Sequence, residues 1–412
     1  MEARILAVTV LIVTACASRP MSGDAPSSAE PIATPTASPE PTRVATPSLV
    51  PPTPRPEPPP RVTRDIAGIE FALLPGGADL RVATALSRDD EVVVAAAVAS
   101  DIPAVEREFA RSFPARPVIY VFATTEGYAE GFVRFFGYGR ATATFIAENS
   151  VSFFEPSLRL IAVNWEAIRD RRPIAAIRHE LTHLLTLQAC TPRCDLVPAW
   201  LNEGQARLAE AFVPGSDWRL VRVRYEAASM AETGTLIPLN TLVSQLAWNA
   251  LTDWAGYFKY QEAARAVELL REDIGGDAPI AILYERLRRG QNVAQAYAAL
   301  TGRSFDAFVA GLAARMRGAV PQTPGIIAVT PEGAPAGYLL YGFAPAATVM
   351  LTISGPRGSE SWPMVISPFG SNFDGVPATR ARGGYTISAQ DASGVFTVKL
   401  RKTDSGSPGD SR

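Results

Sequence analysis

The stretch Ile177–Leu187, IRHELTHLLTL, contains both histidines of this 412-residue chain, His179 and His183. Its leucines and isoleucines recur at helical spacing, so the stretch is predicted to be a helix. Residues four positions apart on a helix lie on one face, so both imidazoles can point at one metal ion, with Glu180 to its side. The alternative is a chance pair of histidines on a buried helix face, where an imidazole without a partner is unfavourable.

A second stretch offers a further ligand. PAWLNEGQARLAEAF, residues 198–212, has helical periodicity, and nineteen residues separate its Glu203 from His183. A catalytic zinc site takes three protein ligands from nitrogen, oxygen or sulfur donors. Glu203 can complete such a set, although a lone glutamate on a helix is otherwise an exposed carboxylate.

The two stretches together resemble the gluzincin metallopeptidases, through H-E-L-T-H followed by W-L-N-E-G. The chain is most similar to the peptidase-MA-like domains often found on bacterial lipoproteins. The similarity covers about residues 64–320, with its specific part within 174–210. It implies a zincin-like fold in which His179, His183 and Glu203 bind zinc. It also implies that Glu180 is the general base and later the proton donor in hydrolysis of a peptide or protein substrate.

The similarity leaves two assignments open: the residue that donates to the oxyanion, and the groups that orient the histidines. With no third histidine, a tyrosine remains as oxyanion donor. Tyr260 aligns better than Tyr257 with the tyrosine of these domains. Many gluzincins place an acid four residues after the glutamate ligand, where this chain has Arg207. Glu210 and a backbone carbonyl are the possible substitutes.

The order of predicted elements indicates an α+β protein. Strands are predicted at 69–74, 116–123, 142–147 and 158–165, a helix at 101–113 starting at Asp101, and mostly helices from 173 to 317. Residues 142–154 are predicted to include the edge strand that binds an extended substrate. Six short strands within 321–404 predict a small β-sandwich that resembles immunoglobulin-like modules, followed by a disordered tail at 405–412.

The N-terminus reads as an export signal. An apolar run at 5–15 ends at Cys16, which resembles a lipoprotein signal peptide (1–16) with a lipidated cysteine; an ordinary cleaved signal is the alternative. Residues 17–63 hold 14 of the 35 prolines and no aromatic residue, which predicts a disordered tether. After export, Cys190 and Cys194 are expected to form a disulfide rather than a zinc site.

These patterns predict a lipid-anchored zinc metallopeptidase outside the cytoplasm, at the cell surface or in the periplasm. A net charge of −2 argues against a nucleic-acid partner. One alternative is a surface binding or adhesion lipoprotein whose peptidase fold is catalytically idle. Another is that the sandwich binds a cell-surface glycan or protein that the peptidase domain then processes.

Overall fold

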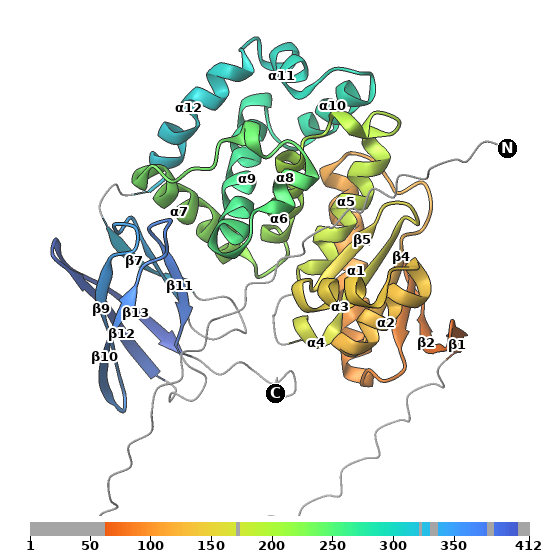
Figure 1. Cartoon of the computed structure of the whole chain (residues 1–412), viewed down its shortest axis with the longest axis horizontal. Coiled ribbons are helices and arrows are strands. Elements are labelled where there is room, and N and C mark those ends of the chain that lie inside the picture. The colour runs from red at the N-terminus through yellow and green to blue at the C-terminus, as the bar shows by residue number, and fades with distance from the viewer. Residues whose placement is uncertain (1–61, 170–173, 321–323, 330–336, 377–382, 403–412) are drawn as a thin grey trace, which may run out of the picture.

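The computed structural model describes residues 62–169, 174–320, 324–329, 337–376 and 383–402. In Figure 1 the chain passes from a sheet region (orange and yellow) through a group of helices (green and cyan) to a second region of strands (blue). The predicted signal peptide with Cys16, the tether up to residue 61 and the tail at 405–412 lie outside the described residues. Strand β1 begins at Thr63, one residue before the predicted start of the folded domain.

The first region is built on one mixed sheet with the strand order β1-β2-β3-β4-β6-β5. Strands β3, β4 and β6 are parallel, whereas β1, β2 and β5 run antiparallel to their neighbours. Every residue of β6 is buried, as expected for a strand covered on both faces. The strands are β1 (Thr63–Ile66), β2 (Ile69–Leu74), β3 (Asp79–Ala83), β4 (Val118–Phe122), β5 (Ser152–Glu155) and β6 (Leu160–Asn164).

Edge strand β5 carries helices on both of its faces. The Phe153 ring contacts Phe132 of α2, whereas the neighbouring Ser152 contacts Glu180 of α5. Because successive strand residues point to opposite faces, α2 and α5 cover opposite faces of the sheet at this edge. The helices of this region are α1 (Arg88–Glu108), α2 (Thr125–Phe136), α3 (Arg140–Asn149) and α4 (Trp165–Ile168).

The strand predicted at 142–147 is wrong, because these residues belong to helix α3. Ala143, Ile146 and Ala147 are buried at the three- and four-residue spacing of a helix, and this pattern outweighs the strand preference of the two threonines. Within the segment 142–154, predicted to include the edge strand, only residues 152–154 lie in a strand, and they belong to β5.

The helix predicted to begin at Asp101 is also wrong in its bounds. Helix α1 begins at Arg88, where the Ser87 side chain accepts a hydrogen bond from the backbone N–H of Asp90. Asp101 lies inside α1 and forms a buried ion pair with Arg178 of α5, at 2.8 Å. This ion pair ties α1 to the helix that carries both histidines.

The second region is helical, and two of its helices approach each other closely. A Cβ atom at Gly204 of α6 would lie 2.5 Å from the carbonyl oxygen of Ala263 in α9, so only glycine allows this contact. None of the described helices is long and apolar enough to cross a bilayer. The helices are α5 (Ala176–Cys190), α6 (Ala199–Ala211), α7 (Asp217–Thr233), α8 (Gln245–Ala250), α9 (Asp253–Ile274), α10 (Asp277–Arg288), α11 (Val293–Thr301) and α12 (Phe305–Arg317).

The third region consists of two antiparallel sheets, in the orders β10-β9-β12-β13 and β11-β8-β7. Side chains of both sheets form one core that includes Tyr338, Leu351 and Ile387, so the sheets pack face to face as a sandwich. Its similarity to immunoglobulin-like modules stays a prediction. The strands are β7 (Gly325–Val329), β8 (Gly337–Tyr341), β9 (Thr348–Gly355), β10 (Gly358–Val365), β11 (Asn372–Gly375), β12 (Gly383–Asp391) and β13 (Gly394–Lys402).

The sandwich is attached to the helical region by aromatic contacts. Phe369 stacks on Phe258 of α9 with ring centroids 4.7 Å apart, and Tyr341 meets Tyr225 of α7 edge to face at 4.8 Å. Ser229 of α7 also donates a hydrogen bond to the carbonyl of Phe369. The whole is a mixed α/β structure, consistent with the predicted α+β class.

Candidate metal centre

Helix α5 holds His179 and His183 one turn apart inside the protein. Both imidazoles are buried, and the rest of the helix is also largely buried between the sheet and the neighbouring helices. A buried helix with fixed neighbours leaves its side chains little freedom, so the two rings are held in a defined orientation.

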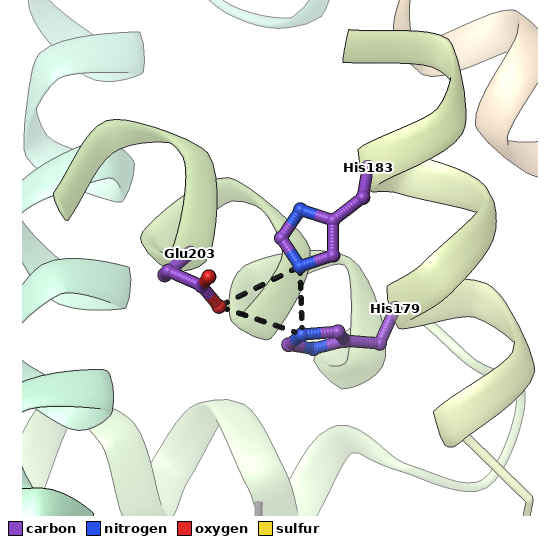
Figure 2. Close-up of side chains that lie close together, drawn as sticks. All are labelled: His179, His183 and Glu203. Carbon is purple, nitrogen blue, oxygen red and sulfur yellow. Dashed lines mark hydrogen bonds and ion pairs between the residues drawn. The ribbon is translucent and has the colours of Figure 1, made fainter. Parts of the chain in front are cut away.

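Glu203 on α6 completes a group of three converging side chains, shown in Figure 2. Its Oε2 atom lies 3.7 Å from Nε2 of His179 and 3.5 Å from Nε2 of His183. The two Nε2 atoms lie 3.1 Å apart. All three ligand atoms fall within 4.8 Å of one another, which is the arrangement expected around one ion.

The outer nitrogen of each histidine has a hydrogen-bond acceptor. Nδ1 of His179 lies 2.8 Å from Oε1 of Glu210, and Nδ1 of His183 lies 3.1 Å from Oδ1 of Asn202. Ionised carboxylate and amide oxygens accept hydrogen bonds, so each Nδ1 carries the proton. In its neutral form each imidazole then leaves Nε2 unprotonated, and this nitrogen presents its lone pair to the centre, as in metal-ligating histidines.

The centre fits a divalent cation on two further observations. Oε2 of Glu203 is buried and accepts no hydrogen bond from any described residue, whereas Oε1 accepts one from Gln245 at 3.2 Å. Burial opposes protonation of His179, yet the nearby carboxylates of Glu203, Glu210 and Glu180 hold its pKa well above the ordinary value. The enclosed site thus favours positive charge, and its two nitrogens and one oxygen are ligands that zinc prefers.

Glu180 faces the edge strand. Ser152 of β5 donates a hydrogen bond to its Oε1 at 2.6 Å, and its Oε2 is buried without a hydrogen-bond partner among the described residues. Burial raises the pKa of this carboxyl above its ordinary value. A carboxylate with one oxygen fixed and one oxygen free beside the three converging ligands is suited to accept a proton.

Glu210 is the hydrogen-bond acceptor for the outer nitrogen of His179. The sequence had left this acceptor open between the Glu210 side chain and a backbone carbonyl. Burial opposes its ionisation, but the charge of Arg207 and the contact with His179 lower its pKa to about 2. Arg207 binds Glu210 directly, and Arg219 of α7 lies 3.5 Å from the same carboxylate. Arg207, at the position where many gluzincins have an acid, thus fixes the acid that contacts the histidine.

Replacement of Glu210 by glutamine should weaken zinc binding by about 10- to 100-fold, the range for removal of such a supporting group. The amide can no longer act as a charged acceptor for Nδ1 of His179 or as a counter-ion for Arg207. Competition with a chromogenic chelator measures the affinity. Glu232→Gln, at an exposed position on α7, is the control, and equal affinities in the two variants would contradict this role for Glu210.

The two candidate tyrosines have different surroundings. Tyr260 of α9 is buried with its ring 6.5 Å from that of His179, and it meets Trp248 edge to face. The Tyr257 hydroxyl instead donates to Glu226 at 2.7 Å and accepts from Gln261. The structure therefore places Tyr260, rather than Tyr257, beside a histidine of the centre.

Cys190 and Cys194 are joined by a disulfide at the end of α5. The bridge closes the turn that leads towards α6, which carries Glu203. It also forms part of the wall of a pocket that reaches His183 and Glu203.

Three residues that contact the centre were not predicted from the sequence. Asn202 directly precedes Glu203, so its place in W-L-N-E-G was the only signal for it. Ser152 is brought to the site by β5 and Gln245 by the first turn of α8, and nothing in the local sequence marks either one.

One family model matches this part of the chain. Residues 149–321 match the family model described as Peptidase MA superfamily, which supports a zincin-like peptidase domain. The matched range contains the three converging ligands, Glu180 and Tyr260, together with β5. Strands β1–β4 and the C-terminal sandwich lie outside it. No curated protein sequence matches the chain.

Proposed function

We propose that the chain is a zinc-dependent metallopeptidase that hydrolyses peptide bonds. The observation that carries this proposal is the convergence of Nε2 of His179, Nε2 of His183 and Oε2 of Glu203 in a buried site. The fixed outer nitrogens of both histidines support it, because they turn both lone pairs toward one point.

Each residue has a separate role in this reaction. His179, His183 and Glu203 would hold zinc, which when bound would supply Lewis acidity for the attacked carbonyl and the attacking water. Glu180 would take the proton from that water and later deliver it to the leaving amine. Ser152 would keep one oxygen of Glu180 in place, so that the other faces the reaction.

The substrate would be held and polarised by two further elements. Among the described strands β5 pairs only with β6, so its outer edge can bind an extended peptide by main-chain hydrogen bonds. Tyr260 would donate a hydrogen bond to the oxygen that becomes negatively charged in the transition state. Its place beside His179 supports this assignment.

The reaction would take place outside the cytoplasm on a lipid-anchored protein. The apolar run at 5–15 and Cys16 support export and lipidation, and the proline-rich segment would hold the enzyme away from the membrane. The disulfide between Cys190 and Cys194 supports an oxidising compartment.

Metal analysis and a cleavage assay test the proposed activity together. The chain, purified without a histidine tag, should contain about one zinc ion, and it should cleave members of a mixed quenched-fluorescent peptide library. A chelator should remove both the zinc and the cleavage, and added zinc should restore them. A folded protein that takes up no zinc would contradict the metal site. A zinc-loaded protein that cleaves no peptide would favour the catalytically idle binding protein.

A further inference from the structure

A pocket of about 210 Å³ opens beside two residues of the metal centre, His183 and Glu203. Small-molecule sites usually measure about 300–1,000 Å³, so this pocket is the size of one side chain rather than of a whole ligand. Its position next to the ligands makes it a place where part of a substrate would lie during the reaction.

The wall of the pocket is mostly apolar. Phe154 and Pro156 contribute from the edge strand and the turn after it, Leu187 contributes from α5, and Val197 and Val243 line other parts. The disulfide between Cys190 and Cys194 adds a further uncharged part of the wall.

Two of the polar side chains that line the pocket already contact the metal ligands. The amide of Gln245 donates to Oε1 of Glu203, and Oδ1 of Asn202 lies at hydrogen-bond distance from His183. No lysine or arginine is among the lining residues, so nothing there would pair with an acidic side chain. A buried charge without a partner is costly, and zinc, when bound, would neutralise the Glu203 carboxylate, so the pocket disfavours charged occupants of either sign.

Covalent and backbone contacts fix two sides of this pocket. At the start of α6, the backbone N–H of Ala199 donates to the carbonyl of Val243, and that of Trp200 donates to the carbonyl of Leu242, both at 3.0 Å. The disulfide closes the turn that follows α5. A wall held in this way can select side chains by size, because it does not need to reorganise when one enters.

The edge strand leads into the pocket. On one face of β5, the side chain of Ser152 contacts Glu180 and that of Phe154 lines the pocket. On the opposite face, Phe153 packs against Phe132. A peptide bound along β5 would alternate its side chains in the same way. One side chain near the cleaved bond would therefore point toward the pocket.

We propose that this pocket receives an apolar side chain of the substrate next to the cleaved bond, and that Leu187, Val197 and Val243 set its size. The inference rests on the proposed peptidase function. The substrates would then be peptides with a leucine-sized or aromatic residue next to the cleaved bond.

Binding to a variant that does not turn over tests the proposal without relying on activity. The zinc-loaded Glu180→Gln protein is titrated calorimetrically with capped hexa-alanine peptides in which one position at a time is Leu, Phe, Asp or Lys. At one position Leu or Phe should bind at least about tenfold more tightly than Ala, the usual effect of filling an apolar pocket. Asp and Lys should gain nothing there.

Val243 is the position to change, because it lines the pocket and the residue is 52% exposed. Val243→Phe should fill the pocket and bring the Leu-to-Ala affinity ratio close to one. Val243→Ala should enlarge it and move the preference from Leu toward Phe. Leu246→Phe is the matched control, since this neighbouring residue is 83% exposed and does not line the pocket.

The outcomes separate this inference from the proposed function. An unchanged Leu-to-Ala ratio in both Val243 variants, or no apolar preference at any position, would overturn the pocket assignment even if the wild-type protein cleaves peptides. A preference that depends on Val243 would support the assignment, even if the Glu180-containing protein cleaves none of these peptides and the proposed activity fails.

Discussion

Replacement of Glu180 by glutamine should leave zinc binding intact and lower kcat by about 10²- to 10⁴-fold. This is the usual contribution of a general base. The amide keeps the shape of the side chain and can still contact Ser152, but it cannot take a proton from water. Metal analysis of the variant and steady-state cleavage of a library peptide measure the two effects separately.

The control for this prediction is Glu148→Gln, which changes an exposed carboxylate on α3 in the same way. It should cleave at the wild-type rate. If Glu180→Gln retained most of the wild-type kcat with zinc bound, another group would have to act as the base. If it lost its zinc, Glu180 would belong to the ligand set and not to the proton-transfer step.

The sequence predicted the convergence of the two histidines because their spacing depends only on local helix geometry. His179 and His183 are four residues apart, and any α-helix places such residues on one face. Glu203 required more, since it lies on a second helix, and it was assigned through the similarity of W-L-N-E-G to known metallopeptidases. Gly204 gives this motif a physical meaning, because it lets α6 approach α9 closely.

The sequence could offer Glu210 only as a candidate, seven residues after Glu203 on the same helix, because tertiary packing decides whether its carboxylate reaches His179. Ser152 could not be predicted, since it lies 28 residues before Glu180 and no periodic pattern connects these two positions. The prediction at 142–147 failed for a related reason. Threonines favour strands in general, but burial of Ala143 and Ile146 at helical spacing decides the local structure.

The position of the sandwich also depends on contacts that the sequence does not reveal. The Phe373 ring stacks on Trp218, with ring centroids 6.0 Å apart, and the guanidinium of Arg222 lies 3.9 Å from its centroid. Both belong to α7, the helix whose Arg219 reaches Glu210. The face of the sandwich near Phe373 is thus used for packing against the helical region, and any ligand of the sandwich would have to bind elsewhere on it.

Replacement of Glu203 by alanine should lower zinc affinity by about 100-fold or more. Zinc sites with four ligands bind with roughly 10–16 kcal/mol, or about 3 kcal/mol per ligand. Loss of one ligand from a set of three protein ligands removes at least that share. Chelator competition gives the affinity, and elemental analysis after dialysis gives the stoichiometry.

A thermal-stability measurement provides an independent readout of the same prediction. Zinc at 100 times its dissociation constant should stabilise the wild-type protein by about 2.7 kcal/mol and so raise its Tm. Glu203→Ala should show little of this increase at the same zinc concentration. Glu232→Ala, at an exposed position on α7, should respond like the wild type. An equal rise of Tm in Glu203→Ala would mean that zinc binds elsewhere, and the buried oxygen of Glu203 would then need another explanation.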